Sequence, residues 1–124
     1  MERVHFAVSA LNQTPLDWSG NLRRSISAVD EARSQGARLL LLPELCLTGY
    51  GCEDAFHSAH IAERAWDSLA ELLPHSRGLV VTAGLPLEHE GELFNVTAVM
   101  VDGCLAGFAA KQHLAGDGIH YEPR

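Results

Sequence analysis

Glu44 is the acidic residue best placed in the sequence to do chemistry. It follows the apolar segment Arg38–Leu42 and Pro43, which predicts that it lies just beyond the end of a buried strand. A carboxylate in this position, partly shielded by apolar neighbours, can have its pKa moved toward neutrality and act as a general base. An exposed loop acid without a catalytic role is the alternative that position alone leaves open.

Lys111 is the second candidate, because it follows the predicted strand Cys104–Ala110. A lysine at a strand end can stabilise a developing oxyanion or pair with a nearby carboxylate. The alternative is an ordinary lysine whose alkyl chain covers apolar surface while its amine stays in water. If the strands before Glu44 and Lys111 run in the same direction in one sheet, the two side chains reach the same edge and keep each other charged.

Three cysteines are candidate nucleophiles, and the sequence favours none of them. Cys52 precedes Glu53 and Asp54 in a run that looks like a catalytic cluster. These acids are expected to raise the pKa of the thiol, and the thiolate is the reactive form. We therefore interpret Cys52 as a structural loop residue and Cys46 and Cys104 as packing residues. An odd number of cysteines without framework spacing is typical of reduced thiols in a cytosolic protein, so we expect a cytoplasmic location.

Other kinds of site lack a sequence signature. His57 and His60 have no second pair at metal-ligand spacing, so no metal site is expected. The absence of G-x-S-x-G, G-x-x-x-x-G-K-[ST] and G-x-G-x-x-G argues against a serine hydrolase and a nucleotide-cradling loop. The net charge of −7, with no basic cluster beyond Arg23-Arg24, argues against nucleic acid as a partner. No apolar stretch approaches the roughly 18 residues that span a bilayer, so no membrane partner is expected.

The segments that must position Glu44 and Lys111 alternate between strands and helices. The 124 residues suffice for one domain with a hydrophobic core, and no linker or repeat divides them. Apolar runs predict strands, the first three of them buried, over Val4–Leu11, Arg38–Leu42, Leu79–Gly84, Leu93–Val101 and Cys104–Ala110. The pair Asp102-Gly103 predicts a hairpin turn between the last two strands.

Two helices separate the first three strands. Helical spacing predicts one over Gly20–Gln35, with Asp17 or Ser19 as its N-cap, and another over Ile61–Leu73. Strand, helix, strand in this order predicts neighbouring parallel strands. The predicted class is therefore α/β with a mixed sheet, followed by a polar, Gly-rich tail over His113–Arg124.

Two segments resemble motifs of the carbon–nitrogen hydrolase (nitrilase) superfamily, in which a glutamate follows a strand in a Pro-Glu motif and a lysine ends a later strand. Glu44 lies in LLLLPELCLTGY and Lys111 in GFAAKQHLAGDG. Within the superfamily, LNQTPLDWSGN and PELCLTGYGCEDAF are most similar to the glutaminase domain of glutamine-dependent NAD synthetases. The resemblance implies that residues 1–124 form the first half of a nitrilase-type αββα sandwich, a partial carbon–nitrogen hydrolase domain.

The resemblance also implies a chemistry. A cysteine thiolate attacks the side-chain amide of glutamine, ammonia leaves, and water hydrolyses the thioester. Glu44 is then the general base, Lys111 stabilises the tetrahedral intermediate, and Tyr50 is a weaker candidate for contacting substrate. The ammonia passes to a second domain that amidates deamido-NAD. ATP and magnesium are implied only for that domain, and no cofactor is expected in this chain.

The sequence departs from the family pattern in one respect, because no cysteine follows Lys111. We therefore expect an N-terminal part of a longer enzyme, inactive alone, whose partners are the rest of the synthetase and, as a homo-oligomer, further copies. A free-standing amidase of the same superfamily is one alternative. A non-catalytic interaction or oligomerisation fragment, in which Glu44 and Lys111 have no chemical role, is another.

Overall fold

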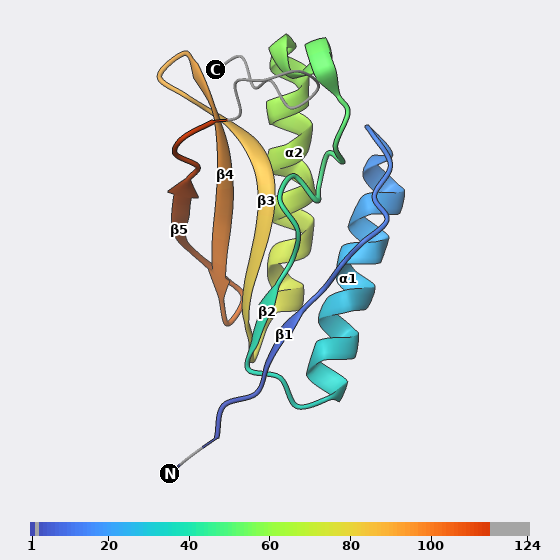
Figure 1. Cartoon of the computed structure of the whole chain (residues 1–124), viewed down its shortest axis with the longest axis vertical. Coiled ribbons are helices and arrows are strands. Elements are labelled where there is room, and N and C mark those ends of the chain that lie inside the picture. The colour runs from blue at the N-terminus through green and yellow to red at the C-terminus, as the bar shows by residue number, and fades with distance from the viewer. Residues whose placement is uncertain (2, 115–124) are drawn as a thin grey trace.

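The computed structural model describes residues 1 and 3–114, and in it two long helices cover one face of a five-stranded sheet (Figure 1). The strand order is β1-β2-β3-β4-β5, so each strand lies beside its neighbour in the sequence. The strands are β1 (Phe6–Val8), β2 (Leu39–Leu41), β3 (Val80–His89), β4 (Glu92–Val101) and β5 (Cys104–Ala110). The helices are α1 (Trp18–Ser34) and α2 (Ala59–Leu72), with short 3-10 turns at Glu53–His57 and Leu73–Ser76.

Helix α1 begins two residues before the predicted Gly20 and is capped as expected. The Asp17 carboxylate accepts a hydrogen bond from the Gly20 amide at 3.1 Å, which satisfies one of the free amides of the first turn. Gly36 follows the helix with a φ of 75°, a conformation that glycine adopts without strain, so the chain turns back there toward β2. Helix α2 lies within two residues of its predicted bounds.

The sheet is mixed, as the sequence predicts. Strands β1, β2 and β3 are parallel, and helices α1 and α2 make the two crossovers between them. Strands β3, β4 and β5 are antiparallel. Asp102 and Gly103 both have positive φ, 50° and 81°, which is the backbone twist of a two-residue hairpin turn. The predicted hairpin is therefore confirmed.

The hydrophobic core lies between the helices and one face of the sheet. Leu40, Val81 and Met100 pair across three neighbouring strands and are at most 1 % exposed. Val29 of α1 and Leu72 of α2 are fully buried in the same cluster. Burying a side chain of this kind contributes about 1.5–3 kcal/mol, so this row anchors both helices to the sheet.

The opposite face of the sheet is apolar and exposed, which corrects one prediction. The first strands were expected to be buried, but Phe6 is 69 % exposed, Val8 71 % and Leu41 36 %. On β4, Val101 is 41 % exposed on the same face. An apolar run looks the same in sequence whether a strand is covered on one face or on both. Within residues 1 and 3–114, both long helices lie on the other side of the sheet.

Candidate active site

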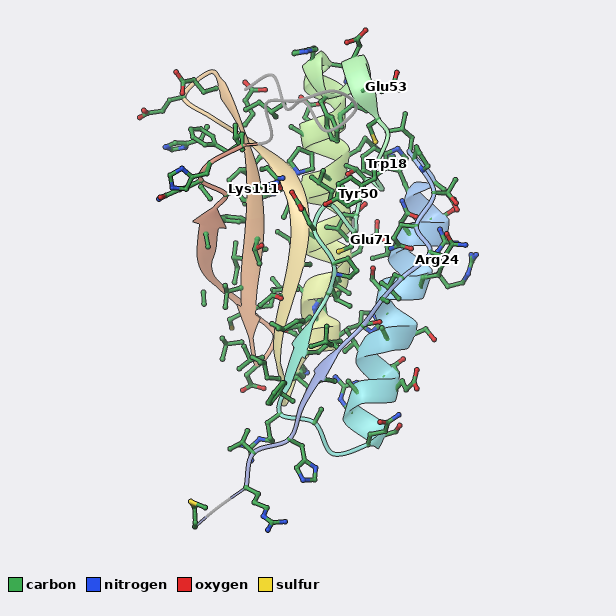
Figure 2. All side chains as sticks on the ribbon, in the orientation of Figure 1. Trp18, Arg24, Tyr50, Glu53, Glu71 and Lys111 are labelled. Carbon is green, nitrogen blue, oxygen red and sulfur yellow. The ribbon has the colours of Figure 1, made fainter. Side chains whose placement is uncertain are left out.

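The Glu44 carboxylate is the centre of a polar cluster built from three parts of the chain. Lys111 Nζ lies 2.8 Å from Glu44 Oε1, and Asn95 Nδ2 donates to the same oxygen at 2.5 Å. Tyr50 Oη donates to Glu44 Oε2 at 2.5 Å. Lys111 and Tyr50 lie on segments that are distant in the sequence and close in space (Figure 2). The structure thus brings together all three residues selected from the sequence.

Strand pairing explains why these side chains meet. Leu42 N donates to Thr82 O at 3.0 Å, so β2 stays against β3 until just before Glu44. Lys111 N donates to Asn95 O at 2.8 Å, which continues the pairing of β5 with β4 to the lysine. Glu44 and Lys111 therefore reach one edge of the sheet, as the sequence predicts.

The surroundings of the Glu44 carboxylate favour its charged form, as expected from pairing with Lys111 and contrary to the upward shift expected from apolar shielding. Burial by itself raises the pKa of Glu44. Hydrogen bonds from Lys111, Tyr50 and Asn95 and the positive charge of the lysine outweigh burial and leave this pKa below its ordinary value. The Glu44 and Lys111 side chains are 37 % and 35 % exposed, so water still reaches the pair. A charged, partly hydrated carboxylate is able to accept a proton.

Asn95 is the site residue that the sequence analysis missed. It is 4 % exposed on β4. Its side-chain amide donates a hydrogen bond to Glu44, and its main-chain carbonyl accepts one from the main-chain amide of Lys111. Its signal was an asparagine inside the apolar segment Leu93–Val101, because a buried polar side chain needs a hydrogen-bond partner. Asn95 thus connects the two charged residues.

The chain has three cysteines, of which two are buried and one is exposed. Cys46 is 1 % exposed, and burial raises the pKa of its thiol to about 11. Cys52 is also buried, and burial, rather than the acidic neighbours invoked from the sequence, raises its pKa. Cys104 is exposed, so its predicted packing role is wrong, and it begins β5 whereas Lys111 follows the end of that strand. Seven residues of extended chain separate them by about 20 Å.

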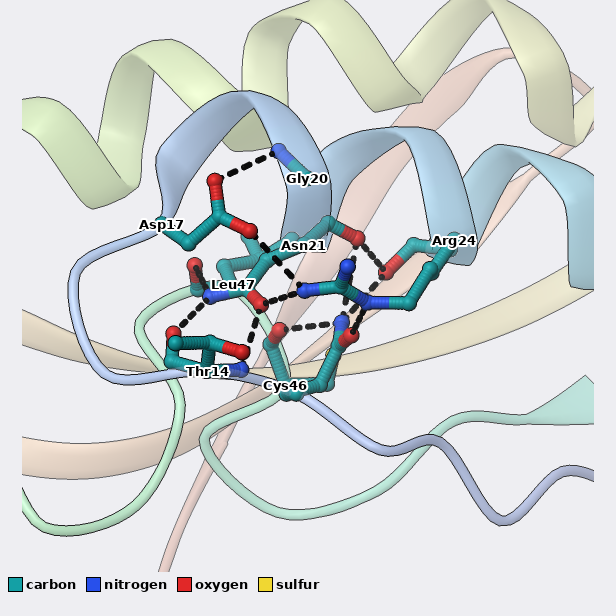
Figure 3. Close-up of polar contacts among 9 residues, drawn as sticks. Thr14, Asp17, Gly20, Asn21, Arg24, Cys46 and Leu47 are labelled. Carbon is teal, nitrogen blue, oxygen red and sulfur yellow. Dashed lines mark hydrogen bonds and ion pairs between the residues drawn. The ribbon is translucent and has the colours of Figure 1, made fainter.

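A buried hydrogen-bond network holds the loop that follows Glu44 (Figure 3). Asn21 of α1 is 0 % exposed and donates to Leu47 O at 3.2 Å and to Thr14 O at 2.8 Å. Gln13 Nε2 donates to Cys46 O at 2.8 Å, and Arg24 Nε donates to Gln13 Oε1 at 2.7 Å. The start of α1 and the segment before it therefore fix the main chain two and three residues beyond Glu44.

Two further features are defined for the described part of the chain. Within residues 1 and 3–114, no three His, Cys, Asp or Glu side chains gather in a group that could hold a metal ion. Among those same residues, no helix is both long and apolar enough to cross a membrane. The predicted tail residues beyond Leu114 lie outside the described residues.

Known proteins share both the sequence and the geometry. The carbon–nitrogen hydrolase family matches residues 6–124. The glutamine-dependent NAD(+) synthetase of Dictyostelium discoideum is 34 % identical over 100 % of this chain, which covers 18 % of that protein. The crystal structure of a glutamine-dependent NAD(+) synthetase from Cytophaga hutchinsonii superposes with a TM-score of 0.93 at 39 % identity, covering 95 % of this chain and 20 % of that one. The chain thus spans about a fifth of the length of these relatives.

A smaller relative has the same fold. A variant of the amidase from Nesterenkonia sp. AN1, with acrylamide added at its active-site cysteine, superposes with a TM-score of 0.82 at 25 % identity. That match covers 93 % of this chain and 46 % of the amidase. The family match spans almost the whole sequence, and the relatives agree with it in fold. The chain belongs to the carbon–nitrogen hydrolase family.

Proposed function

We propose that this chain supplies the general base and the oxyanion-stabilising cation of a glutamine amide hydrolase, whose ammonia serves the amidation of deamido-NAD. The observation that carries the proposal is the 2.8 Å contact between Glu44 and Lys111 at one edge of the sheet. The similarity to glutamine-dependent NAD(+) synthetases over essentially the whole chain supports glutamine as the substrate. No cofactor takes part in this half of the reaction.

In the proposed reaction Glu44 accepts and donates protons, and Lys111 stabilises the negative charge of the intermediate. Glu44 accepts the proton of a cysteine thiol as the sulfur attacks the amide carbon of glutamine. The carbonyl oxygen becomes negative, and Lys111 stabilises it. When the tetrahedral intermediate collapses, Glu44 returns the proton to the leaving nitrogen and ammonia departs. Glu44 then takes a proton from water as the water attacks the thioester, and returns it to the departing sulfur, which releases glutamate and regenerates the thiol.

The thiol in this scheme comes from polypeptide other than these 124 residues. Cys46 and Cys52 are buried with raised pKa values, and Cys104 lies at the far end of β5 from Lys111. The active-site cysteine named for the Nesterenkonia amidase supports a thiol as nucleophile. The proposal also gives the chain a synthetase region that uses ATP and magnesium, further copies of itself as oligomeric partners, and a cytoplasmic location.

Tyr50 has a supporting role in the proposal. Its side chain is 57 % exposed, and its hydroxyl donates to Glu44 Oε2, the oxygen that Lys111 does not contact. A substrate that approaches the carboxylate therefore meets Tyr50 as well. We propose that it contacts the bound glutamine while it orients the base.

A chimera tests the proposal. Residues 1–114 replace the matching segment of the Cytophaga hutchinsonii synthetase, and ammonia released from glutamine is measured together with NAD formation from added ammonia. The chimera should hydrolyse glutamine, and Glu44→Gln or Lys111→Met should reduce that activity by about 10²–10⁴-fold. The ammonia-dependent reaction should be unchanged. The 124-residue chain alone should release no ammonia.

The matched control is Glu53→Gln, which removes an exposed acid from the 3-10 turn in the same part of the chain. It should leave both reactions intact. Full glutamine hydrolysis by the Glu44→Gln chimera would contradict the assignment of the base. Hydrolysis of simple amides in preference to glutamine would favour an amidase instead.

A further inference from the structure

We propose that Gly84 is a positioning residue for Glu44. Its missing side chain lets the main chain of Glu44 and Leu45 lie directly on β3, and this close approach sets the distance from the carboxylate to Lys111 and Asn95. The expected effect of Gly84 on catalysis rests on the proposed function, whereas its effect on the position of the Glu44 carboxylate rests on geometry alone.

The space above Gly84 is occupied by backbone. A Cβ atom added there would lie 2.3 Å from Leu45 N, 2.7 Å from Glu44 Cα and 2.8 Å from Glu44 C. These atoms cannot swing aside as the end of a flexible side chain can. The φ angle of Gly84 is outside the left-handed region, so the strand conformation itself does not require glycine. The requirement is for room, and the residue that needs the room is Glu44.

Hydrogen bonds on both sides hold the turn against β3. Leu42 N donates to Thr82 O at 3.0 Å before the turn, and Leu47 N donates to Gly84 O at 3.3 Å after it. Between them Leu45 has a φ of 50°, a left-handed conformation that is unfavourable for a residue other than glycine. Its side chain is 2 % exposed, so burial holds the residue in that conformation. The main chain of Glu44 and Leu45 is therefore held in direct contact with β3 at Gly84.

The expected displacement is large compared with the tolerance of the site. Ordinary van der Waals contact begins at 3.4 Å, so Leu45 N, at 2.3 Å, would have to move by about 1 Å to admit a methyl group. Glu44 receives hydrogen bonds of 2.5 and 2.8 Å from Asn95 and Lys111, and a lengthening of about 1 Å takes both beyond the roughly 3.2 Å limit of ordinary N–H···O hydrogen bonds. A shift of about 1 Å at the reacting group can reduce an enzyme's rate by about 10²-fold.

The test is the variant Gly84→Ala, followed by ¹³C NMR titration of the Glu44 side-chain carboxyl. Glu44→Gln assigns the resonance. In the unsubstituted chain Glu44 should titrate below its ordinary range, and in Gly84→Ala the titration should move upward as Lys111 and Asn95 lose contact. All titrations are made in about 1 M sucrose, which favours the compact state of a destabilised variant and does not titrate in this pH range.

Val81→Ala is the matched control, because it leaves a cavity in the same strand on the face turned toward the helices. It should lower stability without moving the Glu44 titration. A Gly84→Ala chain whose Glu44 titrates as in the unsubstituted chain would overturn the proposal. So would a Gly84→Ala chain that stays unfolded where Val81→Ala folds, because Gly84 would then serve the fold as a whole.

The chimera separates this inference from the proposed function. Gly84→Ala should lower kcat for glutamine hydrolysis by about 10²-fold, with a smaller change in KM. If the substitution moves the Glu44 titration while hydrolysis is unaffected, Gly84 positions Glu44 but Glu44 is not the base. If Glu44→Gln abolishes hydrolysis and Gly84→Ala changes neither readout, the function stands and the positioning role is refuted.

Discussion

The substitution Asn95→Asp should reverse the pH dependence that Glu44 gives to the stability of the chain. It replaces an amide that donates to Glu44 at 2.5 Å with a carboxyl group of nearly the same shape. In the native chain the pKa of Glu44 is lowered. Its contribution to stability is therefore present above the pKa it has in the unfolded chain and is lost as pH falls through the folded value.

The geometry sets the size of the effect. Two carboxylates in contact have charge centres about 4 Å apart, and like charges at that separation repel by about 4 kcal/mol at an effective dielectric constant of about 20. Glu44 is 37 % exposed and Lys111 remains beside it, so we expect about 2 kcal/mol after screening. The new pair then keeps one proton in the folded state at a pH where the unfolded chain has lost it. Its raised pKa makes the stability contribution present at low pH and lost as pH rises from about 4 to about 7.

The assay is urea unfolding of Asn95→Asp and the unsubstituted chain across that pH range. Val101→Asp is the control, because it adds the same charge to the same face of β4 six residues away, where the side chain is 41 % exposed. The free energy of unfolding of Asn95→Asp should fall by about 2 kcal/mol relative to the unsubstituted chain as pH rises. A change no larger than that of Val101→Asp would show that Asn95 does not contact Glu44 in solution.

Three further results are expected. A double-mutant cycle with Lys111→Met and Glu44→Gln should give a coupling energy of about 0.5–1 kcal/mol that decreases at high salt, because the pair is partly exposed; a coupling of zero would contradict the contact. Asn21→Ala should lower the free energy of unfolding by about 3 kcal/mol in urea titrations, since Asn21 is fully buried and its partners lose their hydrogen bonds; a change under about 0.5 kcal/mol would argue against the network. In the native chain an aromatic disulfide reagent should react at once with Cys104, whereas the buried thiols of Cys46 and Cys52 should react only after unfolding. Rapid reaction of Cys46 in the native chain would contradict its raised pKa of about 11.

Local sequence signals predicted the elements well. The Asp17 cap, the periodicity of α1 and the Asp102-Gly103 turn each depend on residues a few positions apart, so the sequence carries them directly. The pairing of Glu44 with Lys111 was predicted across 67 residues, because parallel strands deliver their carboxyl ends to one edge.

The sequence carried less information about contacts between distant backbone segments. The Asn95 side chain contacts Glu44, which is 51 residues away in the sequence. The need for glycine at position 84 comes from the main chain of Glu44 and Leu45, which crosses β3 there. Neither residue has a local pattern that names its partner. The lowered pKa of Glu44 agrees with the expected pairing with Lys111, whereas the contribution of the Asn95 donor had not been foreseen. The first strands were expected to be buried although Phe6 is exposed, because an apolar strand does not show how many of its faces are covered.

The exposed apolar face and the Glu44–Lys111 pair belong to one continuous surface. Asn95 lies six residues before Val101 on β4, an even number of positions, so the two side chains point to the same face and the site is the polar margin of that hydrophobic area. A polypeptide that packs on the face also withdraws water from the pair, and the attraction between unit charges about 4 Å apart rises from about 1 to about 4 kcal/mol as the effective dielectric constant falls from about 80 to about 20. Burial of the apolar face would then also strengthen the attraction between Glu44 and Lys111. The Glu44–Lys111 pair would therefore be held most tightly in an assembled protein, because the covering polypeptide excludes water from both side chains.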